Sequence, residues 1–257
     1  MSLDLHPSTT PGAKLIQLKT DAWRLEIPPG AAGRYRLAQL DDYRRASRRA
    51  FPWHAPLTLS VKARASDKNI PGTWGFGLWN DPFGMALLQG GGVRFPVLPN
   101  AAWFFFAAPP NYLSLRDDLP AQGALAATFQ SPAWPSWTFL PAIPFTPLLL
   151  VRPLMRGMRR QMQKFVKQEA VDLAVDPTEW HAYRLEWRVN RVIFYMDGKV
   201  ALEATAVPGG PLGVVIWVDN QYAALPPDGG LGYGTLPNPQ PAWIEIEDLA
   251  LNLIGAA

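Results

Sequence analysis

Cysteine is absent from this chain of 257 residues, so disulfide bonds and thiolate metal ligands are excluded. Histidine is scarce as well. Only His6, His54 and His181 occur, and their spacing matches no histidine metal site. We therefore expect neither a metal nor a cofactor.

Charge of one sign and long hydrophobic runs are also lacking. The net charge of +3 is too small to indicate a nucleic-acid-binding protein. No uncharged apolar stretch reaches the roughly 18 residues that suggest a transmembrane helix. Residues 1–12 show no basic segment followed by an apolar run, as a signal peptide would. We therefore expect a cytoplasmic protein without nucleic-acid partners.

Apolar residues, proline, glycine and tryptophan are abundant instead. Apolar residues make up 48% of the chain, which is enough for a sizeable core, and 27 prolines and 21 glycines indicate many turns. A β-protein of this length is often one unit, so we predict a single domain over residues 1–257. The 11 tryptophans suit either a core or a ligand cleft.

Residues 179–199, EWHAYRLEWRVNRVIFYMDGK, predict an antiparallel meander. Tyr183, Leu185 and Trp187 alternate with charged residues, which is typical of a half-buried strand. Residues 192–196 are apolar on both faces, and Asp197-Gly198 favours a tight hairpin turn. The protein should therefore be mainly β.

Similar patterns predict strands at residues 13–19, 23–27, 35–43, 56–66, 72–79, 102–108, 113–115, 125–129, 200–204, 212–219 and 243–253. Residues 102–108 and 212–219 are apolar on both faces, as in a strand that is covered on both sides. Glycines within residues 72–79 indicate close approach by another backbone or a ligand. Apolar parity changes near Asp248, which predicts a β-bulge.

Residues 131–170 read as an insertion that is rich in proline and aromatic residues and leads into a basic amphipathic helix. We expect this helix from near Thr146, with Pro147 in its first turn, to about Gln168, with a break or kink at Pro153 and a weak point at Gly157. Its apolar side carries Val151, Met155, Met158, Met162 and Phe165, and its charges are Arg152, Arg156, Arg159, Arg160, Lys164 and Lys167. The helix could pack on the sandwich, close an apolar pocket as a lid, or lie on a membrane surface. We expect the first.

The segments WHAYRLEW and VIFYMDGK resemble the meander of the concanavalin A-like lectin/glucanase sandwiches, in particular that of family 16 glycoside hydrolases. Residues 75–79 and the closing segment WIEIEDLAL resemble further strands of that superfamily. The resemblance implies an all-β, antiparallel jelly-roll sandwich, here with one helical insertion.

Family 16 enzymes are similar in carrying Glu-x-Asp-x-x-Glu on one cleft strand, which holds the two catalytic carboxylates about 5 Å apart. The candidate strand here is residues 102–107. No Asp or Glu occurs anywhere in residues 82–116. The catalytic residues of the family therefore carry over to no residue of this chain. Glu245 and Glu247 imitate the motif after the meander, and we expect them on the surface of an edge-side strand. Glu186 should form a salt bridge.

Three segments should meet on the concave side of such a sandwich and combine indoles with amides and carboxylates, as sugar sites do. The alternative is that their tryptophans belong to the core and their polar residues form turns. The candidate ligand-binding residues are Trp79, Asn80, Asp81, Trp103, Phe105, Trp217, Asp219, Asn220 and Gln221.

Our leading hypothesis is a non-hydrolytic protein that binds a glycan or an apolar small molecule in this cleft. The aromatic residues in place of the acidic strand favour an apolar ligand. A glycosidase-like enzyme with relocated acids, such as Asp81 and Asp219, is one alternative. A peripheral membrane protein that acts through the basic helix is the other.

Overall fold

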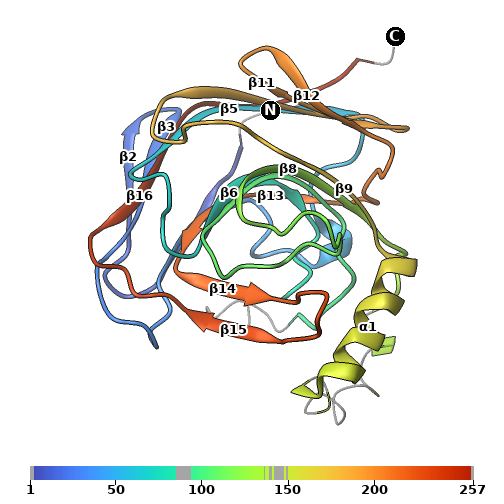
Figure 1. Ribbon diagram of the computed structural model, residues 1–257. Helices are drawn as coiled ribbons and strands as arrows, with labels where there is room; N and C mark the ends of the chain where they lie inside the picture. Colours follow the sequence, from blue (N-terminus) through green and yellow to red (C-terminus); the bar gives the residue numbers. More distant parts are fainter. Residues whose placement is uncertain are drawn as a thin grey trace.

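A computed structural model describes residues 3–84, 94–135, 137, 138, 141, 148 and 150–255. These residues form two seven-stranded antiparallel sheets that pack face to face (Figure 1). The first sheet runs in the order β1 (His6–Thr9), β4 (Leu37–Asp41), β13 (Gly213–Asp219), β6 (Thr73–Trp79), β7 (Ala101–Ala107), β8 (Gly123–Gln130) and β9 (Lys167–Asp172). The second runs in the order β12 (Lys199–Ala204), β11 (Val192–Met196), β10 (His181–Trp187), β5 (Leu57–Ala65), β16 (Ala242–Leu253), β3 (Ala22–Ile27) and β2 (Lys14–Lys19).

Four further elements of the described chain lie outside the two sheets. The strands β14 (Gln221–Ala224) and β15 (Gly232–Thr235) form a hairpin on the side of the first sheet that faces away from the second (Figure 1). The helix α1 (Arg152–Phe165) lies beside that hairpin, and η1 (Arg48–Ala50) is a short 3₁₀-helix.

The main core lies between the sheets because each inner face carries every second residue of its strands. In β5 the buried Leu57, Leu59 and Val61 alternate with more exposed residues. Tyr183 of the meander lies between Phe76 and Phe104 of the opposite sheet, with ring centroids 5.1 and 4.9 Å apart. The predicted meander is thus the part of the second sheet that packs on β6 and β7.

The first sheet is buried on both faces. All residues of β6, β7 and β13 are buried, which confirms the two-sided covering expected for the last two. A second apolar cluster, which includes Trp79, Trp103 and Trp217, lies on the face away from the main core. Loops and the β14–β15 hairpin cover that face.

Several predictions about single segments are wrong. Residues 113–115 form no strand, whereas β1, β9, β14 and β15 have no strong sequence pattern and were not expected. His6 lies in β1, and β9 makes residues 167–170, which were expected in the insertion, part of the first sheet. Backbone pairing of β1 with β4 and of β9 with β8 places both segments in the sheet. The sequences of β1 and β9 lack the alternation that is typical of a half-buried strand.

The helix α1 is shorter than predicted and continuous. It begins after Val151, so Pro153 falls in the first turn, where its missing N–H costs no helical hydrogen bond. No break occurs at Pro153 or Gly157. The expected start at Thr146 and Pro147 lies outside the described residues. None of the described helices has the length and apolar character needed to cross a membrane.

The strand β16 is central rather than edge-side, because it pairs with both β3 and β5. Glu245 is therefore buried instead of being exposed, and it accepts hydrogen bonds from Arg24 and Arg64. The predicted bulge is confirmed by a register shift between Glu247 and Ala250 and by φ of +55° at Asp248. The expected ion pair of Glu186 also forms, with Arg188 at 2.6 Å.

Candidate functional site

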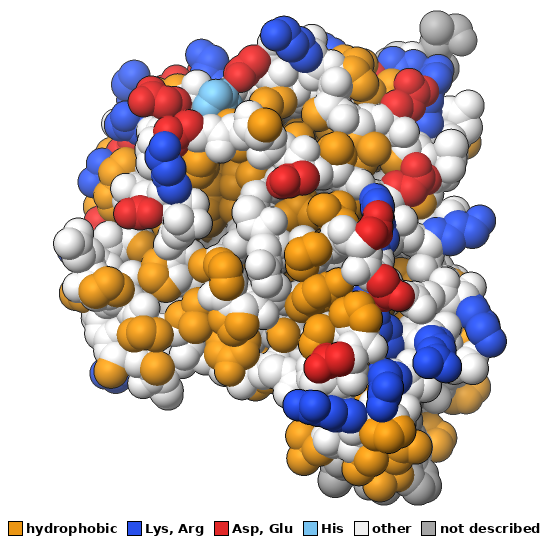
Figure 2. Space-filling model, in the orientation of Figure 1, with side chains coloured by type: hydrophobic (Ala, Val, Ile, Leu, Met, Phe, Trp, Pro, Cys, Tyr) orange, Lys and Arg blue, Asp and Glu red, His pale blue; other side chains and the backbone are white. Residues whose placement is uncertain are grey.

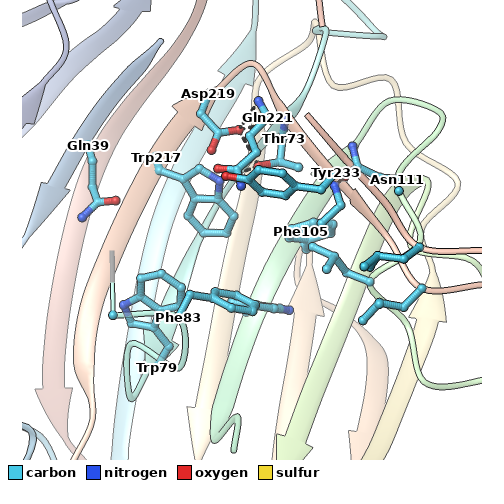
Figure 3. A pocket seen from close by; sticks show the side chains of 17 residues that line it. Gln39, Thr73, Trp79, Phe83, Phe105, Asn111, Trp217, Asp219, Gln221 and Tyr233 are labelled. Carbon is cyan, nitrogen blue, oxygen red and sulfur yellow. Dashed lines mark hydrogen bonds between the residues drawn. The ribbon is translucent and has the colours of Figure 1, made fainter. Parts of the chain in front are cut away.

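A cavity of about 450 Å³ lies between the first sheet and the β14–β15 hairpin (Figure 3). Four aromatic side chains from β6, β7 and β13 form its floor: Trp79, Trp103, Phe105 and Trp217. The indoles of Trp79 and Trp217 are parallel within 3°, with centroids 6.3 Å apart. Trp103 lies 5.8 Å from Trp217 and 5.5 Å from Phe105, so the rings form one continuous apolar surface.

Two glycines of β6 make room for this floor. A Cβ atom on Gly75 would lie 2.8 Å from the indole of Trp217 and 2.3 Å from the carbonyl oxygen of Phe104. A Cβ atom on Gly77 would lie 2.6 Å from Cα of Trp103. The glycines expected to mark a close approach are therefore positions where neighbouring aromatic residues lie directly against the strand.

The hairpin supplies the opposite wall through Gln221, Ala223 and Tyr233. Backbone and side-chain hydrogen bonds hold it in place. The N–H of Ala223 donates to Oδ1 of Asn111 at 3.0 Å, and the N–H of Tyr112 donates to the carbonyl of Ala223 at 2.9 Å. Asn111 is fully buried, so this anchor is shielded from water.

Polar groups gather at one end of the cavity, around Asp219 (Figure 3). Its Oδ1 accepts the hydroxyl of Thr73 at 2.8 Å and the backbone N–H of Gln221 at 3.2 Å, and its Oδ2 accepts the hydroxyl of Tyr35 at 3.3 Å. The indole N–H of Trp217 donates to Thr73 Oγ1, which directs the hydroxyl proton of Thr73 towards Asp219. The network thus joins the aromatic floor to the carboxylate.

Burial raises the pKa of Asp219 to about 7, although its donors oppose this shift. Burial and the neighbouring Asp219 also raise the pKa of Tyr35 well above its usual value, so the phenol stays protonated. Near neutral pH the polar end of the cavity therefore holds a carboxyl group that exchanges a proton.

Six of the nine predicted ligand-binding residues line the cavity. They are Trp79, Trp103, Phe105, Trp217, Asp219 and Gln221. They come from segments far apart in the sequence, and the pairing of β6 with β7 and β13 brings them together.

The other three predicted residues, Asn80, Asp81 and Asn220, lie outside the cavity lining. Asn80 donates to the carbonyl of Leu98, and Asp81 is buried in an ion pair with Arg94 at 2.9 Å. Asn220 is fully buried.

Asn220 bridges two backbone segments, because it accepts from the N–H of Arg36 and donates to the carbonyls of Arg34 and Leu236. Asn80 and Asn220 thus bind neighbouring backbone, and Asp81 binds the side chain of Arg94. These contacts are internal to the protein.

Several lining residues were not predicted from the sequence, among them Gln39, Thr73, Phe83 and Tyr233. The strand period provides a signal for Gln39, since it shares a face of β4 with the covered Leu37. Phe83 and Tyr233 lie in or beside segments without a regular pattern, so no such signal exists for them.

The described residues contain no group of three or more His, Asp or Glu side chains that could hold a metal ion. Asp219 is the one acidic residue among the described side chains of the lining. The cavity therefore offers aromatic surface and a single carboxyl group.

No protein-family model and no curated protein sequence matches this chain. Solved structures do match. A family 16 glycoside hydrolase from Bacteroides ovatus, described in complex with its product, aligns with a TM-score of 0.50 and 10% identity over 94% of this chain and 85% of its own. The fold is that of the concanavalin A-like sandwiches.

Other glycoside hydrolases align with slightly lower scores. The laminarinase catalytic domain of Thermotoga maritima gives a TM-score of 0.49 and 10% identity over 96% of this chain and 82% of its own. An endo-β-galactosidase from Clostridium perfringens gives 0.47 and 11% over 94% of this chain. The present chain spans 58% of the length of that enzyme. At 10% identity, the match to the Bacteroides ovatus enzyme shows a shared jelly-roll sandwich fold alone.

Proposed function

We propose that this protein binds a small, mainly apolar molecule in the cavity and does not hydrolyse glycosides. The main support for the proposal is that β7 presents aromatic side chains, and no acidic ones, to the cavity. Trp103 and Phe105 project from this strand, and β7 contains no acid. This is the strand on which the resemblance to family 16 enzymes would place the catalytic pair.

A relocated catalytic pair has little support in the geometry. Retaining glycosidases need two carboxyl groups about 5 Å apart and on either side of the scissile bond. Asp219 lines the cavity, but Asp81 does not, and its carboxylate is buried against Arg94. The two acids therefore share no substrate-binding space, and Asp219 alone supplies no acid–nucleophile pair.

The balance of polar and apolar groups favours an apolar ligand over a glycan. A sugar presents a hydroxyl on nearly every carbon, and each buried hydroxyl needs a partner. Thr73 and Asn111 already use their polar atoms within the protein, and most donors around Asp219 point at its carboxylate. The four-ring floor instead suits a flat or aliphatic molecule, with one polar group directed towards Asp219 and Gln221.

The test is a pair of alanine-to-phenylalanine variants assayed with the neutral dye N-phenyl-1-naphthylamine and with laminari-oligosaccharides. Ala223 lines the cavity, so Ala223→Phe should fill part of it and weaken dye binding by about tenfold or more. Ala182 is exposed on the second sheet and gives the matched control Ala182→Phe. Dye affinity should be unchanged in that control.

The proposal fails if both variants bind the dye as wild type does. It also fails if the oligosaccharides bind in preference to the dye or are cleaved. In that case, loss of cleavage in Asp219→Asn would establish the enzyme alternative, and oligosaccharide binding without cleavage would establish a lectin.

A further inference from the structure

Exposed hydrophobic side chains gather where α1 begins, at one end of the molecule (Figure 2). Leu150 is 72% exposed, and Leu148, Val151 and Leu154 are between 46% and 49% exposed. Isolated apolar residues on a surface are ordinary, whereas a contiguous group at a projecting end indicates an interaction site. These four residues are called the α1 tip below.

Basic side chains lie directly above the α1 tip (Figure 2). Arg152, Arg156 and Arg160 are exposed at intervals of one helical turn and form no ion pair within the described part of the chain. Residues 119–168 contain no acid. We call these three arginines the basic collar.

The two acids that come just before this acid-free stretch form ion pairs with other residues. Asp117 pairs with Arg159, and Asp118 pairs with Arg116. The basic collar therefore keeps its positive charge available to an external partner.

The orientation of the tip is fixed by Arg159, the one basic residue of α1 that is buried. Its guanidinium donates to the carbonyls of Ser114 and Leu225 at 2.8 and 2.6 Å and pairs with Asp117 at 2.8 Å. Arg159 is thus unavailable to a membrane, and it does not belong to the basic residues on which the peripheral-membrane alternative relies. It holds α1 on the sandwich so that the tip points outward.

We propose that the α1 tip and the basic collar bind the surface of a membrane that contains anionic lipids. An exposed apolar tip below a row of arginines matches a bilayer, whose acyl boundary accepts leucine while its headgroups attract the guanidinium groups. A second copy of this chain would oppose an identical basic collar, and the like charges would repel. This proposal does not rest on the ligand in the cavity.

The α1 tip also lies next to a wall of the cavity. A Cβ atom on Gly229 would lie 2.3 Å from the carbonyl oxygen of Arg152, so the loop between β14 and β15 touches the start of α1. Leu225 and Leu231, at the two ends of that loop, line the cavity. Membrane contact would therefore bring the mouth of an apolar cavity close to the lipid surface.

The experiment measures co-sedimentation with vesicles of phosphatidylcholine alone and of equal parts phosphatidylcholine and phosphatidylglycerol. Wild type should bind the anionic vesicles at low salt and release them near 1 M salt, where screening acts within about 3 Å. The triple variant Arg152→Glu/Arg156→Glu/Arg160→Glu should bind them about 100-fold more weakly or worse, since each basic residue adds roughly a factor of five to ten.

Two controls separate this effect from total charge and from misfolding. Lys19→Glu/Arg34→Glu/Arg49→Glu makes the same charge change at exposed positions elsewhere and should bind as wild type does. Leu150→Glu should weaken binding, whereas Val189→Glu, at a site 75% exposed far from α1 in the sequence, should not. Circular dichroism and dye binding in the cavity verify the folded state of each variant.

Three results would overturn the proposal: no binding of wild type to anionic vesicles, equal binding by the two triple variants, or equal binding by the two glutamate variants. Light scattering tests the other possible partner of the tip, which is a second copy of this chain. A dimer that Leu150→Glu dissociates, together with no vesicle binding, would show that a second copy covers the tip.

Discussion

Asp219 combines full burial with a carboxyl group that titrates in the neutral range. In water an aspartate loses its proton near pH 4. Here the low-dielectric surroundings penalise the charge more than the donors from Thr73, Gln221 and Tyr35 stabilise it. The residue therefore connects the aromatic floor, through Trp217 and Thr73, to the protonation state of the cavity.

This pKa predicts how stability changes with pH. Between the unfolded pKa near 4 and the folded pKa near 7, the folded state binds one more proton at Asp219 than the unfolded state does. Its contribution to the free energy of unfolding is therefore highest at low pH and falls by up to about 4 kcal/mol as pH rises through 7.

Urea unfolding of wild type and Asp219→Asn at several pH values measures this contribution. The difference, wild type minus variant, should fall between pH 4 and pH 8, since other titrating groups such as Asp42 are common to both proteins. A difference that stays constant over this range would contradict the prediction.

At the scale of elements, one buried arginine determines how α1 is attached. The helix ends at Phe165, and the chain enters β9 two residues later, so the backbone connection holds the C-terminal end of α1. The rest of the helix is held mainly by side chains. Met155 and Arg159 are the buried residues of α1. Arg159 donates to four acceptor groups, the carbonyls of Ser114, Arg116 and Leu225 and the carboxylate of Asp117.

Arg159→Ala should lower the free energy of unfolding by about 2–4 kcal/mol, because it leaves several polar groups without partners and opens space under the helix. Arg160→Ala is the matched control, because Arg160 is exposed, and it should change stability by less than about 0.5 kcal/mol. Thermal unfolding gives both values, and hydrogen exchange should show faster exchange in residues 152–165 of the first variant alone. Equal stability of the two variants would argue against this anchor.

At the scale of the whole molecule, the β14–β15 hairpin adds a wall to the outer face of the first sheet and so forms a partly open cavity. The first sheet carries aromatic residues on a face that would otherwise be exposed to water. Burying that face without a ligand leaves a space of about 450 Å³ with apolar walls. An apolar ligand would replace the contacts that this space lacks.

The protein purified directly from cells should therefore carry an apolar molecule that native mass spectrometry detects at near one-to-one ratio. Its removal with a hydrophobic resin should lower the Tm, since a ligand at about 100 times its Kd stabilises the folded state by roughly 2.7 kcal/mol. The Ala223→Phe variant should carry less of the molecule, and treatment with the resin should change its Tm little. A wild-type protein that is free of ligand, with a Tm unaffected by the resin, would contradict this expectation.

The sequence was most informative where a strand had a regular period. The meander, the two-sided strands β7 and β13, the bulge at Asp248 and the glycines of β6 all followed from local patterns. Short edge and hairpin strands such as β1 and β14 were missed, because their pairing depends on partners distant in the sequence. The same limit applied to Asn80 and Asn220, whose polar groups suggested a site but bind backbone.

By itself, the sequence determined a mainly β protein with an antiparallel meander and with an aromatic rather than acidic β7, because residue period and residue type are local properties. The sandwich was implied by the family resemblance. Only the tertiary structure decided which polar groups face the cavity and which are used internally. Asp219 and Asn220 are neighbours in the chain, yet one lines the cavity and the other is enclosed by backbone. That difference arises from strand register, since successive side chains point to opposite sides and their surroundings come from remote segments.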